Sequence, residues 1–223
     1  MNQKQSTLDL VKSNKGYFIV FLLFVVVGAI VLLTTKKGDT LLYINSLHTP
    51  FWDMFFKNAT HLGDGIIFGI MLIPLGIVRI KYIFYGLATL ATSGLGAQLF
   101  KRIFDEPRPL KYLGEAAIMN FVEGVRVHSH NSFPSGHTST GFAICLLLAI
   151  LVPNKKLGVL FGIVAIMIGM SRVYLVQHFF VDVYFGSILG VIMTILTYQL
   201  FQSWNALNTA GWTTYSPLEK IRG

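Results

Sequence analysis

Three cationic side chains in this sequence could bind the oxygens of a phosphate group. They are Lys101, Arg108 and Arg172. Cations and N–H donors bind phosphate oxygens, and the planar guanidinium of arginine can bind two oxygens at once. Pro107 and Pro109 flank Arg108, and their fixed φ angles restrict the backbone on both sides of it. These residue types indicate an anion-binding site.

A second motif of the same chemical kind is Pro134-Ser135-Gly136-His137, which directly precedes an apolar stretch. If that stretch is a helix, the motif lies at its N-terminus, where unpaired N–H groups and the positive end of the helix dipole face outward. Gly136 has no Cβ atom, so a ligand could approach the backbone closely there. The motif could therefore form an anion cradle.

A pair of histidines and a carboxylate could perform the reaction itself. His178 and Asp182 are four residues apart, so on a helix they lie on the same face. The carboxylate can accept a hydrogen bond from one ring nitrogen, which leaves the other nitrogen with an exposed lone pair. This arrangement predicts a histidine nucleophile oriented by an acid. His137 is then available to protonate a departing alkoxide.

The composition indicates that the elements positioning these residues are membrane helices. Of 223 residues, 53% are hydrophobic and 13% are charged, whereas soluble proteins have about 25% charged residues. The net charge of +8 does not indicate a nucleic-acid-binding protein, because the basic residues are scattered between apolar runs and form no stripe. Basic residues flanking membrane helices explain this charge more simply.

Six apolar stretches are predicted to cross the bilayer, which takes about 20 residues of helix, or ~17 at the short end. They cover residues 17–34, 63–78, 82–100, 138–152, 157–170 and 179–201. We therefore expect one all-α integral membrane domain over residues 1–223, with its chemical motifs within 101–182. With six spans, these motifs all fall on the face of the membrane opposite the termini.

The orientation follows from the basic residues of the short loops. The two hairpins on the side of the termini contain Arg79, Lys81, Lys155 and Lys156. All 18 Lys and Arg residues divide equally between the two sides, but the side of the termini has more once Lys101, Arg108 and Arg172 are set aside. The positive-inside rule then places both termini, with the polar tail of residues 202–223, in the cytoplasm. The motifs would face the periplasm or the exterior.

Two further segments and two glycine pairs have their own expected roles. Residues 40–61 are predicted to form one helix lying in the membrane interface. Aromatic rings prefer the interface, and this segment contains Phe51, Trp52, Phe55 and Phe56. Residues 101–137 form a long polar loop, which is typical of a functional segment. The pairs Gly158/Gly162 and Gly186/Gly190 have the spacing of helix-packing faces.

Taken in order, the motifs carry a family resemblance. The pattern Lys-x6-Arg-Pro, then Pro-Ser-Gly-His, then Ser-Arg-x5-His-x3-Asp resembles the three-part signature of the type 2 phosphatidic acid phosphatase (PAP2) superfamily, which includes glucose-6-phosphatase and vanadium haloperoxidases. Every signature position is filled. The positions are Lys101, Arg108, Pro109, Pro134, Ser135, Gly136, His137, Ser171, Arg172, His178 and Asp182.

The resemblance implies a function and a role for most of these residues. It implies a phosphohistidine intermediate on His178, with His137 as the acid for the leaving group. It also implies phosphate binding by Lys101, Arg108, Ser135, Gly136 and Arg172, with no required metal or cofactor. We therefore expect a lipid phosphatase of the bacterial inner membrane, resembling those that act on undecaprenyl pyrophosphate or phosphatidylglycerophosphate. Its partners would be a lipid phosphate and membrane lipids, without nucleic acid or an obligate protein partner.

Several alternatives remain open at this point. A lipid A phosphatase or a phosphate transferase would use the same residues. A haloperoxidase would share the pocket chemistry, although the peroxidases of the family are mostly soluble. An inactive lipid-binding or transport protein would be expected to lack a motif residue, and none is missing. His128 and His130 could bind a metal with Asp105 or Glu106, but nothing in the sequence fixes that geometry.

Overall fold

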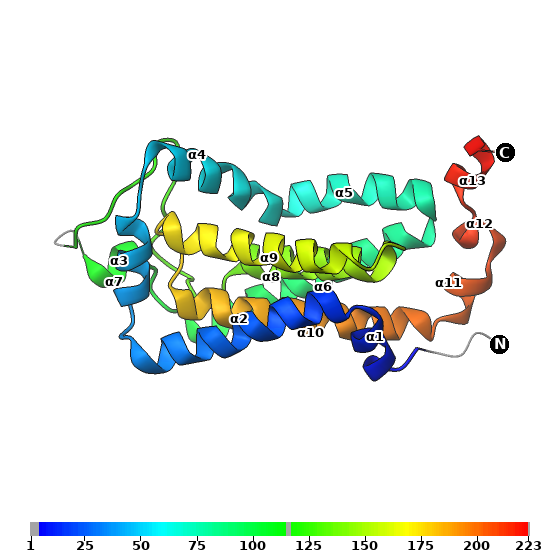
Figure 1. Ribbon diagram of the computed structural model, residues 1–223, viewed down its shortest axis with the longest axis horizontal. Coiled ribbons are helices and arrows are strands. Elements are labelled where there is room, and N and C mark those ends of the chain that lie inside the picture. Colours follow the sequence, from blue (N-terminus) through cyan, green and yellow to red (C-terminus); the bar gives the residue numbers. More distant parts are fainter. Residues whose placement is uncertain (1–4, 115–116, 223) are drawn as a thin grey trace.

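The computed structural model describes residues 5–114 and 117–222, and every regular element within these ranges is a helix. Within these ranges, six apolar helices of 14 residues or more run along the long axis of the molecule (Figure 1). They are α2 (Lys15–Thr34), α5 (Gly65–Val78), α6 (Lys81–Phe104), α8 (Gly136–Leu151), α9 (Leu157–Tyr174) and α10 (Phe180–Gln202). Each of them coincides with one predicted span, so the all-helical fold class is confirmed.

The six helices differ in how well each could cross a bilayer alone. In the described ranges, four stretches are long and apolar enough, namely those of α2, α6, α9 and α10. Helix α5 is shorter and forms a bent pair with the segment before it, at an angle of 64°. Helix α8 has 16 residues, or about 24 Å of helix against a hydrocarbon core of about 30 Å. The chain is a multi-pass membrane protein, while the count of six spans stays a prediction.

The prediction of one continuous interfacial helix over residues 40–61 is wrong, because the segment is divided into separate elements. The segment contains α3 (Asp39–Ser46), α4 (Pro50–Ala59) and the 3-10 turn η1 (Thr60–Gly63). A new helix begins at Pro50 because proline suits the first helical position and the Thr49 side chain caps the start by accepting a hydrogen bond from the Trp52 amide. Helix α4 then packs against α9 and leads into α5.

The two ends of the bundle have different contents (Figure 1). One end holds the turns between α5 and α6 and between α8 and α9. It also holds the short helices near the termini: α1 (Thr7–Ser13), α11 (Asn205–Thr209), α12 (Gly211–Thr214) and α13 (Pro217–Arg222). The other end holds α3, α7 (Pro109–Leu113) and the long connection between α7 and α8. The three motifs lie at this second end, as the six-span topology predicts.

Helix α8 lies at the centre of the bundle, packed by α6, α9 and α10. Gly190 lets α10 approach the backbone of α8 so closely that a Cβ atom there would overlap the Ser139 carbonyl. Gly186 likewise faces the backbone of Ser135, and Gly162 faces Val20 of α2. The predicted glycine packing faces are therefore confirmed. Gly186 and Gly190 determine how α10 is placed relative to the start of α8.

Side-chain polarity is distributed as in a protein surrounded by lipid. Large apolar residues such as Leu33, Ile66 and Leu95 are exposed on the outer surface of the helices. Small polar residues such as Ser187 and Thr194 are fully buried between helices. Small residues at helix contacts allow close packing where no hydrophobic effect drives association. The bundle is therefore suited to holding a polar site at its end.

Candidate active site

Backbone hydrogen bonds connect the three motifs at the second end of the bundle. The Ser135 amide donates to the Asp182 carbonyl at 3.0 Å, which joins the start of α8 to the start of α10. The Ser132 amide donates to the Glu106 carbonyl at 2.9 Å, which joins the long loop to the segment after α6. Lys101 approaches the α8 start, with its Cε 4.0 Å from where a Gly136 Cβ would stand. The residues of the three motifs thus lie together in one site.

His178 and Asp182 form a buried pair at the junction of α9 and α10. The His178 Nδ1 lies 3.3 Å from the Asp182 Oδ2, and both side chains are 2% exposed. The same carboxylate oxygen accepts hydrogen bonds from the Ser132 hydroxyl and from the Phe179 amide. With Nδ1 directed to the carboxylate, Nε2 is the ring nitrogen left for a substrate, as the spacing predicts.

The electrostatic surroundings keep His178 neutral. Burial lowers the pKa of His178 well below its usual value, and the positive charges of Arg108, Arg172 and Lys101 lower it further. At neutral pH the ring therefore carries a free lone pair on Nε2. A neutral imidazole beside several cations is the arrangement that a histidine nucleophile needs to attack a phosphate.

Gln177 links the two arginines. The Arg108 Nη1 donates to the backbone and side-chain oxygens of Gln177, both at 3.3 Å. The Arg172 Nη2 donates to the same side-chain oxygen at 3.4 Å, and its Nη1 donates to the Thr60 hydroxyl at 2.6 Å. Within the described residues, the buried Arg172 Nε has no hydrogen-bond partner. Because an unsatisfied buried donor is costly, this N–H is suited to an anion oxygen.

The Ser135 side chain caps α8, and Lys101 points back toward the loop. The Ser135 Oγ accepts from the Thr138 hydroxyl at 2.9 Å and from its amide at 3.4 Å, which starts the helix at Gly136. The Lys101 ammonium donates to the Asn131 carbonyl. The start of α8 thus lies beside a lysine, while the Ser135 side chain is occupied by the helix cap. Anion binding by Ser135 and Gly136 stays a prediction.

A second histidine–carboxylate pair was not predicted from the sequence. The His137 Nε2 lies 2.8 Å from the Asp64 Oδ1, and the other oxygen of Asp64 lies 3.1 Å from the His61 Nδ1. Asp64 stands at the break between η1 and α5. Gly63 allows this approach, since a Cβ atom there would meet the His137 carbonyl at 2.8 Å. An acidic residue directly before a span, on the motif side, is the signal that could have indicated it.

Other residues that hold the site were also missed. Thr60, Ser132 and Gln177 contact the arginines and the carboxylate through side chains. The backbone carbonyl of His130 accepts a hydrogen bond from Arg108, and that of Arg126 accepts one from Gln177. The His130 Nε2 lies 3.4 Å from the Lys111 ammonium. Among the described residues, no three His, Cys, Asp or Glu side chains lie close enough together to hold a metal ion.

Comparisons with known proteins identify the family and the fold that this chain resembles. The family model described as the PAP2 superfamily matches residues 82–206. The lipid A 1-phosphatase of Rhizobium johnstonii is 33% identical over 120 residues, which cover 54% of this chain and 47% of that protein. The chain thus spans about half the length of this curated relative.

Two solved structures have a similar fold. The crystal structure of Aquifex aeolicus LpxE has a TM-score of 0.62 and 28% identity, covering 72% of this chain and 93% of that one. The transmembrane PAP2-type phosphatidylglycerolphosphate phosphatase from Bacillus subtilis has a TM-score of 0.51 and 25% identity, covering 83% of this chain and 95% of that one. Both are similar to this chain over most of their own length.

Proposed function

The chain belongs to the PAP2 superfamily, and from this we propose that it is a membrane lipid phosphatase acting through a phosphohistidine on His178. The observation that carries the proposal is the buried His178–Asp182 pair beside Lys101, Arg108 and Arg172. A neutral nucleophile and a cluster of cations are the two requirements for phosphoryl transfer without a metal.

In the proposed reaction, His178 Nε2 attacks the phosphorus and the bond to the leaving oxygen breaks. The cations and the first amides of α8 stabilise the charge on the equatorial oxygens. His137 donates its proton to the leaving oxygen, so that the lipid departs as an alcohol or a monophosphate. His137 then accepts a proton from the water that attacks the phosphohistidine, which releases inorganic phosphate and restores His178.

Asp64 completes this scheme by orienting the acid. A carboxylate 2.8 Å from the His137 Nε2 fixes the ring. Burial and the positive charge of Arg172 lower the pKa of His137 to about 4, and Asp64 opposes this lowering, as the negative charge of a bound phosphate would. The other ring nitrogen, Nδ1, can then carry the transferable proton. Each histidine of the reaction therefore has its own carboxylate partner, Asp182 for the nucleophile and Asp64 for the acid.

The substrate class is a phosphomonoester or diphosphate of a lipid. The similarity to a lipid A 1-phosphatase and to Aquifex aeolicus LpxE makes lipid A phosphate a second candidate substrate. Phosphate release from phosphatidic acid, phosphatidylglycerophosphate, undecaprenyl pyrophosphate and lipid A, each in detergent, tests the proposal. Bromide oxidation with vanadate and peroxide, without phosphate release from any of these lipids, would indicate a haloperoxidase instead.

Activity is expected to survive chelation and to be inhibited by vanadate. The groups proposed to stabilise the transition state are side-chain cations and amides, so EDTA should leave the rate of phosphate release within about twofold of the untreated rate. Vanadate adopts the five-coordinate geometry of the transition state and should compete with substrate. Loss of activity in EDTA that added magnesium restores would contradict the mechanism.

We further propose that the site faces the periplasm or the exterior from the inner membrane. The basis is the set of basic residues in the short hairpins, including Arg79 and Lys155, at the opposite end of the bundle. Single cysteines at the exposed positions Glu123 and Asn154, in a Cys145→Ala background, should report the orientation. An impermeant maleimide applied to spheroplasts should label position 123 and spare 154. The reverse labelling would place the site in the cytoplasm.

A further inference from the structure

Asp64 has a second histidine partner besides the proposed acid. The Asp64 Oδ1 lies 2.8 Å from the His137 Nε2, and the Asp64 Oδ2 lies 3.1 Å from the His61 Nδ1. His61 and Asp64 belong to one turn, because the Asp64 amide donates to the His61 carbonyl at 2.9 Å. The side chains of His61, Asp64 and His137 thus form one continuous row, and the proposed reaction gives a role only to the last two.

The Asp64 side chain does not make the contact that its position favours. Asp64 is the N-cap residue of α5, and an aspartate at an N-cap commonly accepts a hydrogen bond from an amide of the first helical turn. In α5, whose residues the structure describes throughout, no amide donates to the Asp64 side chain. Both carboxylate oxygens are directed to histidine rings instead. A carboxylate at this position therefore has two competing arrangements, one that caps α5 and one that orients His137.

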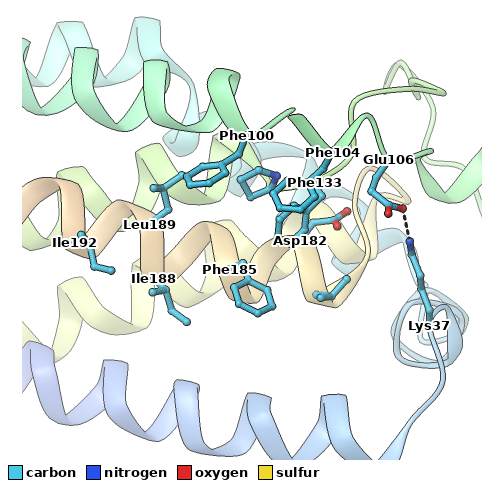
Figure 2. A pocket seen from close by; sticks show the side chains of 12 residues that line it. Lys37, Phe100, Phe104, Glu106, Phe133, Asp182, Phe185, Ile188, Leu189 and Ile192 are labelled. Atoms are coloured by element: carbon cyan, nitrogen blue, oxygen red, sulfur yellow. Dashed lines mark hydrogen bonds and ion pairs between the residues drawn. The ribbon is translucent and has the colours of Figure 1, made fainter. Parts of the chain in front are cut away.

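Asp182, the partner of the proposed nucleophile, shows how firmly such a carboxylate can be held. Its Oδ2 accepts hydrogen bonds from the Ser132 hydroxyl and from the Phe179 amide. The Asp182 side chain is 2% exposed, and it lines a largely apolar cavity together with Phe133 (Figure 2). Hydrogen bonds and burial together restrict its orientation.

Asp64 has much weaker support. Its side chain is 36% exposed, and among the described residues its one side-chain hydrogen bond is with the ring of His61. The His61 side chain is itself 61% exposed, so it contributes little to the packing of the bundle. An exposed pair of this kind also adds little to stability. The contact with Asp64 is therefore the feature of His61 that bears on the site.

We propose that His61 is a positioning residue of the reaction. Its Nδ1–H donates to the Asp64 Oδ2 and keeps the carboxylate turned toward His137 and away from the amides of α5. The inference rests on the proposed function, in which His137 is the acid. His61 acts through Asp64 and does not contact the reacting atoms. Groups that hold a carboxylate behind a functional histidine are known from metal sites, where their loss costs about tenfold or more.

The test compares His61→Ala with His61→Asn on a lipid phosphate and on p-nitrophenyl phosphate. Alanine removes the donor, whereas the amide nitrogen of asparagine is as many bonds from the backbone as the histidine Nδ1 and can donate to the same oxygen. The matched control is His48→Ala, which removes another exposed histidine at the same end of the bundle, between α3 and α4. All three variants should fold, because the side chains that they replace are exposed.

His61→Ala should lower kcat on the lipid phosphate by about tenfold. KM should stay within about twofold, because a residue that does not contact the substrate adds no uniform binding. The rate on p-nitrophenyl phosphate should fall much less, because its leaving group needs little protonation. His61→Asn and His48→Ala should stay within about twofold of the wild type on both substrates. A merely structural defect would lower both rates by the same factor, and asparagine would not restore them.

A double-mutant cycle shows whether His61 acts through Asp64. In an Asp64→Asn background, His61→Ala should lower the rate on the lipid phosphate by less than about twofold, because the carboxylate that it positions is already gone. The inference would be overturned by wild-type kcat in His61→Ala, by equal losses on the two substrates, by failure of asparagine to restore the rate, or by the same loss in both backgrounds. A wild-type protein that releases no phosphate from any lipid would instead overturn the proposed function, and this inference with it.

Discussion

Replacement of His178 by alanine is expected to lower phosphate release by about 10⁴-fold or more, because the variant lacks the side chain proposed to form the covalent intermediate. His178→Asn, which retains more of the side-chain volume, should be equally inactive. The control is His128→Ala, which changes an exposed histidine of the long loop. Turnover measured on a long-chain lipid phosphate, with size-exclusion elution as a check of folding, decides the outcome. Normal turnover by either His178 variant would rule out the nucleophile.

Replacement of His137 by alanine should have an effect that depends on the leaving group. For a lipid phosphate, whose alkoxide must be protonated, the rate should fall by about 10²- to 10⁴-fold. For p-nitrophenyl phosphate, whose leaving group needs little protonation, the loss should be much smaller. Asp64→Asn should also lower the rate on a lipid phosphate more than the rate on p-nitrophenyl phosphate, but by a smaller factor than His137→Ala. In this variant His137 is retained, but it loses its charged partner at 2.8 Å.

The comparison of these two variants separates a role in proton transfer from a role in folding. A defect in folding would lower the rates on both substrates by the same factor, whereas loss of the acid should widen the ratio between them. If His137→Ala and Asp64→Asn impair p-nitrophenyl phosphate hydrolysis as strongly as lipid hydrolysis, His137 is not the acid. Thr209→Ala, far from the site at the opposite end of the bundle, serves as a neutral reference.

The parts of the fold that could be predicted from the sequence are those determined by local composition. A long apolar stretch by itself predicts a membrane helix. The ends of α2 and α10 were therefore predicted to within about two residues. The motif residues were found because their types and spacing are specific. His178 and Asp182, for example, are close in the chain, so helix geometry alone predicts their contact.

The parts that could not be predicted depend on contacts between distant segments. Asp64 meets His137 only because α4 and η1 pack over α9 and place the start of α5 beside α8. Thr60 reaches Arg172 for the same reason, across 112 positions of the chain. The break at Pro50 was missed because apolar and polar residues are mixed along the whole of residues 40–61, which suggested one continuous interfacial helix. The position of Asp64 before a span marks it as a candidate, but a single sequence does not show which distant residue it meets.

The chain also shows how a membrane fold can keep a polar site at its end. The glycines of α10 bring its first turn against the start of α8, and the Ser135 amide then meets the Asp182 carbonyl at 3.0 Å. This contact places the first turn of α8 beside the His178–Asp182 pair. Substituting Gly190 would therefore displace the proposed anion cradle and the proposed nucleophile relative to each other, as well as disturb packing.

The central claim, a covalent phosphate on His178, is tested most directly by trapping the intermediate. The protein is mixed with a lipid phosphate carrying a radioactive phosphoryl group, quenched in denaturant at alkaline pH, and digested for localisation of the label. We expect a label that is stable to alkali and labile to acid, as a phosphoramidate is, on the peptide containing His178. It should be absent from His178→Ala. A label that is stable to acid, or one that persists in His178→Ala, would contradict the mechanism.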